Sequence, residues 1–314
     1  MKKFFKIVSF YTFTIVDEKE ILELKEILKL YERDNLSGLL ILAKEGINGT
    51  ICGQEKFVSD FLERIKKFLN ENDLNEKVSF SNKEIFKKLK IKIKPEIVTM
   101  GIDNIDPKLD SGIYLDSLSW NQLIQDEDTL IIDTRNHYEV SLGSFKNSIN
   151  PKTNNFREFP EWLEKNLVKY THNEVNKKIA MYCTGGIRCE KATSFLKKKG
   201  YKNVYHLKGG ILNYLKEIPK DENFYKGECY VFDERVALTN NLEKGSYSIC
   251  HACGMPLSVD DKRKKTYLEG VQCHQCINKF SDEDRIRFAE RQKQFDQRKL
   301  IKNYSKKTLK INED

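Results

Sequence analysis

The sequence predicts a multidomain α/β protein of 314 residues, with two domains that mix strands and helices and a small cysteine-rich region. Three observations support this fold class. Strands and helices alternate over the first hundred residues, a second alternation follows a turn-rich segment, and two Cys-x-x-Cys pairs lie near the end. We therefore expect an α+β domain over residues 1–100, a linker over 101–117, a parallel-sheet domain over 118–220 and a metal-binding region over 221–314.

Composition limits the class of protein. A charged fraction of 32% with 39% hydrophobic residues is typical of a globular protein with an ordinary core. The net charge of +8 slightly favours acidic partners, although a lysine-rich solvated surface gives the same value. The first residues imitate a secretory signal, but Lys6 interrupts the apolar run and no cleavage site follows.

No apolar stretch is long enough to span a bilayer, so no membrane partner is expected. The eight cysteines are not spread as a disulfide framework, because four lie in the two Cys-x-x-Cys pairs and one lies in a glycine-rich loop. Such usage suits a reducing cytoplasm, where we expect the protein to be located. No sequence feature fixes its oligomeric state.

The first hundred residues have the element order of a ferredoxin-like half, βαββαβ. Apolar residues at helical spacing indicate the two helices, and short apolar or β-branched runs indicate the strands. Residues 44–49 form a turn-rich corner. The expected elements are strands over 5–14, 37–43 and 50–52, helices over 18–31 and 54–69, and strand-like sequence through residue 100.

Near the end of this domain a strand alternates strictly between lysine and apolar residues. Its lysines share one face: Lys88, Lys90, Lys92 and Lys94. One interpretation is an edge strand that lysine protects against aggregation. The other is a stripe that contacts the phosphates of a nucleic acid. The sequence leaves both open.

The second domain follows residues 101–117, whose Pro107, Gly112 and several aspartates indicate a linker. The buried-strand run 130–132 ends at Asp133 and Arg135. Charged residues at the carboxyl ends of parallel strands often line the functional crevice, and Asp133 could also position a neighbouring loop. The alternative is an ion pair that only terminates the strand.

Cys183 lies at a corner between a buried strand over residues 178–182 and a helix over 189–199. The residues between are Thr184, Gly185, Gly186, Ile187 and Arg188. Paired glycines let successive N–H groups face one centre, which favours an anion. Beside Arg188 and a helix N-terminus, the Cys183 thiol should have a lowered pKa and react as a thiolate. A buried, inert cysteine is the alternative.

The length of this loop separates two classes of enzyme. Cysteine phosphatases place five residues between cysteine and arginine, whereas four separate Cys183 from Arg188, so the loop resembles that of rhodanese sulfurtransferases. Cys189 follows in the first helical turns. It could resolve an oxidised Cys183, but packing in a helix is the more common role of a free cysteine.

The last third contains two cysteine pairs separated by nineteen residues, 254–272, which is typical of a four-thiolate zinc site. The predicted ligands are Cys250, Cys253, Cys273 and Cys276. Four protein ligands leave no open position, so the metal would be structural. Because His251 and His274 lie within the pairs, a mixed set of cysteine and histidine ligands is the alternative.

The charged tail after Ser281 is expected to be a solvated helix or, less commonly, a helix along RNA.

Four segments together resemble the rhodanese-domain tRNA uridine(34) hydroxylase family. They are residues 44–50 (Lys-Glu-Gly-Ile-Asn-Gly-Thr), 183–192 (Cys-Thr-Gly-Gly-Ile-Arg-Cys-Glu-Lys-Ala), 230–236 (Tyr-Val-Phe-Asp-Glu-Arg-Val) and 250–254 (Cys-His-Ala-Cys-Gly). The resemblance covers nearly the whole chain. A plain rhodanese would share only the loop type and the surroundings of Asp133 and Gly209-Gly210.

The resemblance implies that the protein acts on tRNA, hydroxylating the wobble uridine at C5 with molecular oxygen, with Cys183 as the catalytic cysteine. Arg188 accompanies it in the loop. No flavin, haem or nicotinamide motif is evident. Our mechanistic hypothesis is that Cys183 adds to C6 of a flipped uracil and makes C5 electron-rich. A persulfide on Cys183 is the rival hypothesis.

Two other functions remain as alternatives. One is a sulfurtransferase that carries sulfur as a cysteine persulfide, although such an enzyme does not need the two additional domains. The other is a zinc-stabilised RNA-binding protein with a vestigial loop. The intact pair of Cys183 and Arg188 counts against the second.

Overall fold

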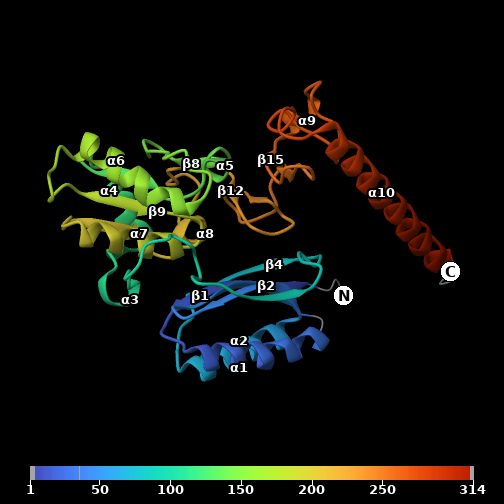
Figure 1. Ribbon diagram of the computed structural model, residues 1–314, viewed down its shortest axis with the longest axis horizontal. Helices are drawn as coiled ribbons and strands as arrows, with labels where there is room; N and C mark the ends of the chain where they lie inside the picture. The colour runs from blue at the N-terminus through green and yellow to red at the C-terminus, as the bar shows by residue number, and fades with distance from the viewer. Residues whose placement is uncertain (1–3, 35, 312–314) are drawn as a thin grey trace. The chain divides into compact units, whose positions relative to one another are not determined.

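The structure, a computed structural model, describes residues 4–34 and 36–311. The chain divides into two compact units, Met1–Lys244 and Gly245–Asp314 (Figure 1). Within the described residues, no helix combines the length and apolar composition needed to cross a membrane.

The first part of the larger unit has the predicted ferredoxin-like arrangement. Its sheet has the strand order β4-β1-β3-β2-β5. Both helices lie on one face of this sheet, and their apolar sides form a common core with it (Figure 1). The elements are β1 (Phe5–Phe13), α1 (Glu18–Lys29), a 3₁₀ turn (Leu30–Asp34), β2 (Ser37–Ala43), β3 (Gly46–Gly53), α2 (Glu55–Leu69), β4 (Lys77–Ser81) and β5 (Leu89–Ile93).

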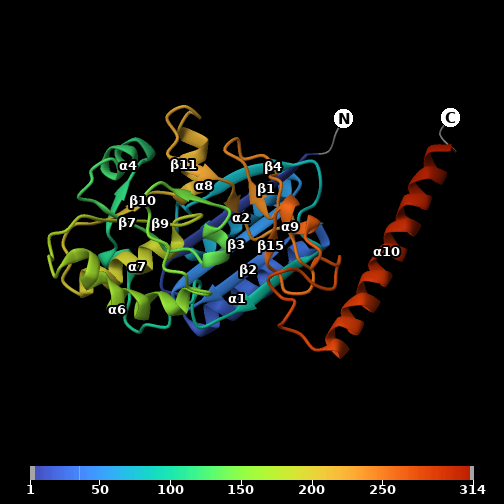
Figure 2. The ribbon, with the colours of Figure 1, turned by 90° about the horizontal axis from the view of Figure 1, so that it is seen from above.

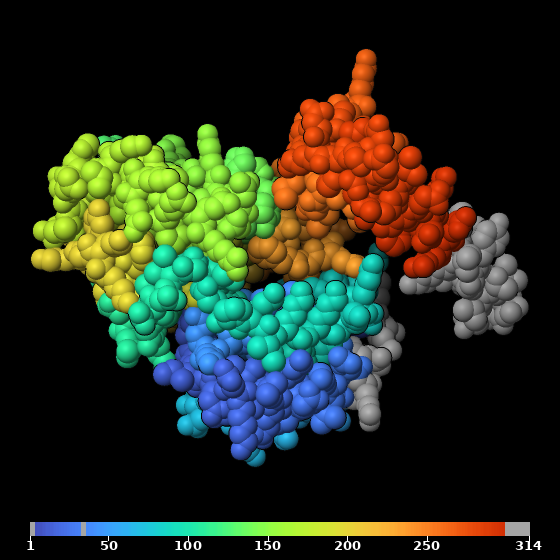
Figure 3. All heavy atoms as spheres, in the orientation of Figure 1, coloured from blue at the N-terminus to red at the C-terminus, as the bar shows by residue number. Residues whose placement is uncertain are grey.

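Strand β5 lies at the edge of this sheet, parallel to β2. The four lysines in and beside it are exposed, and Figure 3 shows the cyan part of the chain that includes β5 on the visible surface of the domain. Both interpretations of the lysine stripe require this exposure. The corner before β3 is shorter than predicted, because β3 already begins at Gly46 and pairs with β2.

The second part of the larger unit has the predicted parallel sheet, with the order β6-β10-β9-β7 (Figure 2). Helices α6 and α7 share a core with one face, and α4 and α8 share a core with the other. Its strands are β6 (Ile113–Leu115), β7 (Leu130–Asp133), β9 (Ile179–Tyr182) and β10 (Val204–Leu207), and its helices are α4 (Ser117–Ile124), α5 (His137–Val140), α6 (Phe159–Thr171), α7 (Ile187–Lys198) and α8 (Gly210–Glu217).

Two predicted boundaries differ from the structure. Residues 101–117, expected as a linker, contain α3 (Pro107–Asp110) and β6, which is an edge strand of the parallel sheet. Residues 221–244, expected in the C-terminal region, belong to the larger unit. There β11 (Tyr225–Gly227) pairs with β8 (Gly143–Phe145), and β12 (Cys229–Tyr230) pairs with β13 (Ala237–Leu238). Tyr225 and Cys229 are buried in the core of the parallel-sheet domain, which explains why this segment stays with it.

The smaller unit is built around the cysteine pairs. A two-stranded sheet of β14 (Ser248–Ile249) and β15 (Pro256–Leu257) precedes α9 (Val259–Arg263) and the long helix α10 (Asp282–Ile311). Its apolar core consists of the cysteines with Leu257 and a few partly buried neighbours. A core this small is typical of units that depend on a bound metal for their stability.

Candidate active site

Cys183 follows β9 directly and is 1% exposed. The N–H of Gly186 donates to its Sγ at 3.1 Å, and α7 begins at the next residue, so the positive end of a helix lies beside the sulfur. Gly186 has a φ of 103°, and a Cβ there would lie 2.8 Å from the hydroxyl of Tyr11. Both facts explain why glycine occupies this position.

The turn at Gly209 and Gly210 holds the loop from another side. The N–H of Ile211 donates to the carbonyl of Cys183 at 2.9 Å, and the N–H of Leu212 donates to that of Thr184 at 3.1 Å. A Cβ on Gly210 would lie only 2.5 Å from the Cys183 carbonyl oxygen. The loop is therefore fixed by backbone hydrogen bonds from α8 as well as by its own helix.

The surroundings of Cys183 stabilise its thiolate. Burial alone raises the pKa of Cys183, but the thiol of Cys189, the charge of Arg188 and the N–H groups of Gly186 and Cys189 outweigh it and lower the pKa to about 5. Burial and the neighbouring Cys183 raise the pKa of Cys189 well above its usual value, so Cys189 remains a thiol. Its Sγ also lies 3.5 Å from Oγ1 of Thr134. At neutral pH the site therefore contains one thiolate and one neutral thiol.

Arg188 is paired with a buried carboxylate. Its Nη1 and Nη2 donate to the two oxygens of Glu139 at 2.6 and 2.8 Å, and Glu139 is completely buried. Burial raises the pKa of Glu139, but the Arg188 charge and its hydrogen bonds lower it below the usual value. Oγ1 of Thr184 also lies 3.4 Å from Glu139. Arg188 thus supports the loop and helps to stabilise the Cys183 thiolate, but its positive charge is paired with the Glu139 carboxylate.

Asp133 and Arg135 form an ion pair of 2.6 Å in which both side chains are completely buried. Arg135 also donates to the carbonyl of Gly143 at 2.6 Å and to the hydroxyl of Tyr225 at 3.3 Å. Among the hydrogen bonds of the described residues, none joins Asp133 to residues 184–188. The pair therefore ties the end of β7 to β8 and β11, and Thr134 between them is the residue that reaches the site.

The helix after the loop carries two charged residues that bind the N-terminal domain. Tyr11 donates to Oε1 of Glu190 at 2.6 Å. Lys191 is 2% exposed and forms ion pairs with Glu45 at 2.7 Å and Glu96 at 2.6 Å. The residues that follow Arg188 in the loop motif thus fix the N-terminal domain against the site, and Glu45 from the segment 44–50 is one of their partners.

The four cysteines of the smaller unit converge. Their Sγ atoms lie within 4.8 Å of one another, and three of the separations are 3.6, 3.8 and 4.0 Å. A tetrahedral zinc with bonds of about 2.3 Å requires sulfur atoms about 3.8 Å apart, so this cluster fits a metal ion. His274 lies 3.6 Å from Asp261 and, within the described residues, no histidine joins the group. The four cysteines, rather than a mixed set, are therefore compatible with a metal site.

Comparison with known proteins agrees with this architecture. Residues 5–97 match the model of the UPF0176 acylphosphatase like domain, and residues 119–217 match that of the rhodanese-like domain. A tRNA uridine(34) hydroxylase of Prochlorococcus marinus (strain MIT 9515) is 61% identical over 300 residues, which are 95% of this chain and 97% of that protein. The chain belongs to the tRNA uridine(34) hydroxylase family.

Other relatives and solved structures are also similar. The tRNA uridine(34) hydroxylase of Prochlorococcus marinus subsp. pastoris (strain CCMP1986 / NIES-2087 / MED4) is 62% identical over 296 residues, 94% of this chain and 96% of that protein. A crystal structure of a rhodanese-related protein from Thermoplasma volcanium is 27% identical and covers 33% of this chain and 92% of its own, with a TM-score of 0.27.

The sequence analysis did not predict several residues that lie at the Cys183 site of this family member. Glu139 had a local signal, because Asn136 and Glu139 have the spacing of a capping box, which the structure contains. Tyr11 and Lys77 had none, since they lie more than a hundred residues before Cys183 in another domain. Glu190 was within the motif, but its partner is visible only in the structure.

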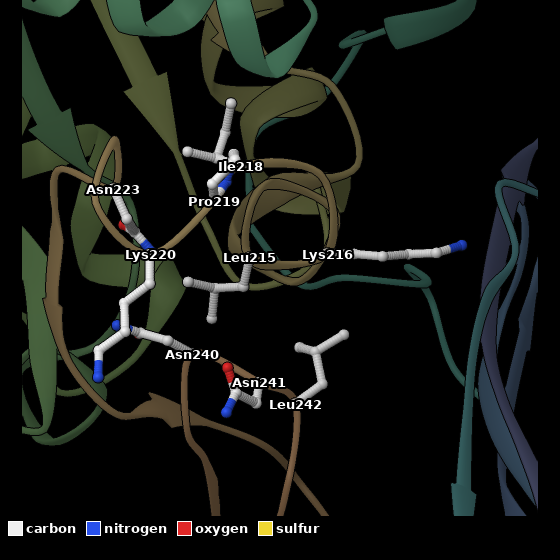
Figure 4. A pocket seen from close by; sticks show the side chains of 9 residues that line it. All are labelled: Leu215, Lys216, Ile218, Pro219, Lys220, Asn223, Asn240, Asn241 and Leu242. Atoms are coloured by element: carbon white, nitrogen blue, oxygen red, sulfur yellow. The ribbon is translucent and has the colours of Figure 1, made fainter.

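The larger unit also has a pocket of about 380 Å³ at the end of α8 (Figure 4). Its lining includes Leu215, Lys216, Lys220, Asn240 and Leu242. None of the residues of the Cys183 loop lines it. The pocket is therefore separate from the thiolate site, which the hydrogen bonds and charges described above define.

Proposed function

We propose that this chain is a tRNA-modifying enzyme that hydroxylates C5 of the wobble uridine, position 34, with Cys183 as the reacting group and molecular oxygen as co-substrate. The observation that carries the proposal is the stabilised thiolate, with a pKa of about 5, in a member of the tRNA uridine(34) hydroxylase family. A tRNA substrate places the reaction in the cytoplasm.

In the proposed first step the Cys183 thiolate attacks C6 of the uracil. The S–C6 bond forms, the π electrons of C5=C6 move toward C4, and O4 takes the negative charge as an enolate. C5 then carries electron density and can react with an electrophile. Gly186 and Cys189 hold the thiolate before the attack, and the base must be turned out of its stack to reach it.

The sulfurtransferase alternative has less support. The chain belongs to the tRNA uridine(34) hydroxylase family, and Arg188, the cation of the loop, is already bound by both oxygens of Glu139. The RNA-binding alternative with a vestigial loop is also weaker, because Cys183 keeps hydrogen-bond donors that an inert cysteine does not need.

We propose zinc as the metal of the four-cysteine cluster. Without an open ligand position, it would stabilise the smaller unit only.

Cys183→Ser tests the reaction. Serine is nearly isosteric, so the fold, the metal content and the affinity for tRNA should stay close to wild type, while the nucleophile is lost. In cells that contain only this variant and no parallel route to the nucleoside, 5-hydroxylated uridine should disappear from position 34. Nucleoside analysis by mass spectrometry measures it, and a wild-type level would exclude the loop as the reaction centre.

We propose further that Lys88, Lys90, Lys92 and Lys94 contact phosphates of the tRNA. Their support is an exposed row of positive charge on one edge strand. Reversing all four to glutamate should weaken binding and flatten its salt dependence, because fewer counterions are released.

The control reverses four lysines on the helices of the same domain, Lys19, Lys25, Lys56 and Lys67, which changes the net charge equally. Binding is measured by titration at several salt concentrations. If the stripe variant binds as the control does, lysine at β5 only protects the edge of the sheet.

A further inference from the structure

Lys77, the first residue of β4, is a half-buried cation on the N-terminal domain. Its Nζ donates to the carbonyl of Asn75 at 2.6 Å and lies 4.6 Å from the centre of the Tyr11 ring. Among residues 4–32 and 36–298, whose side chains the structure describes, no carboxylate forms an ion pair with this ammonium group within 4.0 Å. Lys77 is therefore held by a ring and a carbonyl, and its charge is not matched by an ion pair.

The position of Tyr11 places Lys77 beside the thiolate site. The Tyr11 hydroxyl touches the loop at Gly186, where a Cβ would lie 2.8 Å away, and it donates to Glu190 on α7. The charge of Lys77 acts on both Glu190 and Cys183. Burial lowers the pKa of Lys77 to about 8, while the charges of Glu190, Cys183 and Asp73 oppose the change, so the ammonium form still prevails at neutral pH.

The other charges around Cys183 are already compensated. Arg188 is paired with Glu139, and Lys191 is paired with Glu45 and Glu96. Burial raises the pKa of Glu190, and the Tyr11 hydroxyl donates to its Oε1 at 2.6 Å.

Cys189, Cys229 and Tyr11 stay neutral, because burial raises the pKa of each, to about 12 for Cys229. Among the side chains that the structure describes, Lys77 is thus a cation near the thiolate with no ion-pair partner within 4.0 Å.

We propose that Lys77 is a catalytic cation, supplied by the N-terminal domain, that binds the carbonyl oxygen O4 of the uracil while Cys183 adds to C6. As the S–C6 bond forms, the C5=C6 π electrons move onto O4 and the ammonium group stabilises the enolate. After C5 has been hydroxylated, loss of the C5 proton forms the enolate again, and expulsion of the Cys183 thiolate restores C5=C6. This role rests on the proposed function. It also gives the N-terminal domain a part in the chemistry.

Lys77→Met removes the charge and retains the stem of the side chain. The first measurement needs no tRNA: the ultraviolet absorbance of the thiolate is titrated against pH, and the curve of the matching Cys183→Ser variant is subtracted. Without Lys77 the Cys183 thiolate should form at higher pH. The second measurement is the turnover of tRNA to the hydroxylated nucleoside, which should fall about 100-fold, as when one oxyanion donor is removed.

In Lys77→Arg the Cys183 thiolate should form at a pH close to that of the wild type, and part of the turnover should return. Lys56→Met, on the exposed side of α2, is the matched control and should behave as wild type. Melting curves verify the fold, and Lys77→Gln makes the same comparison should the methionine variant unfold.

Turnover by Lys77→Met equal to that of the wild type would overturn the proposal. Reduced turnover that Lys77→Arg does not restore, with an unchanged titration, would show that the lysine supports structure only. If the wild-type chain made no hydroxylated nucleoside, the proposed function would fail, but the titration would still decide whether Lys77 acts on the thiolate.

Discussion

Cysteine has opposite roles in the two units of this protein. In the larger unit a single thiolate, Cys183, accepts a hydrogen bond from the N–H of Gly186 at 3.1 Å, and the neighbouring Cys189 thiol lowers its pKa. In the smaller unit four sulfur atoms lie 3.6–4.0 Å apart in the separations given above, as ligands of one metal ion would. The residue type is the same, but the number of sulfur atoms that share one centre differs.

This difference decides reactivity. Metal-bound thiolates give their electron pairs to the ion, and four of them leave it no open position. The electron pair of Cys183 is only hydrogen-bonded, so a proton donor can be exchanged for an electrophilic carbon. The negative charge of Cys183 is stabilised by groups that form no covalent bond to sulfur, such as the N–H of Gly186 and the charge of Arg188. A stabilised thiolate is therefore a nucleophile only where its stabilisation leaves a lone pair available.

Of the changes that test this difference between the metal-binding cysteines and Cys183, removal of one metal ligand should have the largest effect. Cys250→Ser should abolish binding of about one zinc per chain and unfold the smaller unit, because the metal–ligand free energy, on the order of 10 kcal/mol, is also folding free energy. Metal analysis and limited proteolysis of residues 245–314 measure both. The thiolate titration of Cys183 should not change.

Cys52→Ser is the matched control, since Cys52 is buried in an apolar cluster of the N-terminal domain and belongs to neither site, and it should retain the metal. Unchanged zinc in Cys250→Ser would show that the four cysteines are not the ligands. A changed Cys183 titration would show that the two cysteine sites are coupled.

The sequence predicted those features that depend on local patterns. Alternating strands and helices indicated both domains, and the strand, paired glycines and Arg188 indicated the reactive loop. The spacing of the cysteine pairs indicated the cluster, because chelation by a Cys-x-x-Cys turn is itself local. The strands β6, β12 and β13 escaped prediction since two or three residues show no periodicity, and this displaced both domain boundaries.

The charge partners could not be predicted in the same way. Asp133 and Arg135 were expected in the crevice, but at a strand end the side chain that faces the loop depends on packing, and here it is Thr134. Tyr11 and Lys77 come from another domain, so only tertiary structure places them near Cys183. Whether Arg188 is free or matched was likewise undecided until its pairing with Glu139 was observed.

A smaller effect is expected at Cys189, whose thiol is the first of the groups that lower the pKa of Cys183. Cys189→Ala removes this donor and should raise that pKa by about one unit, the value of a hydrogen bond to a charged group. Cys189→Ser retains an O–H donor and should titrate close to wild type.

The direction of this pKa change determines the pH range in which Cys189→Ala and the wild type differ. A raised pKa reduces the thiolate fraction just above pH 5, where the wild type is already ionised, and leaves it unchanged near pH 9, where both are thiolates. The absolute deficit in nucleoside formation by Cys189→Ala, measured against pH, should therefore be largest between about pH 5 and 6 and disappear at higher pH. Loss of activity in Cys189→Ser at every pH would instead show that the Cys189 sulfur takes part in the chemistry, which would make the larger unit a two-thiol site.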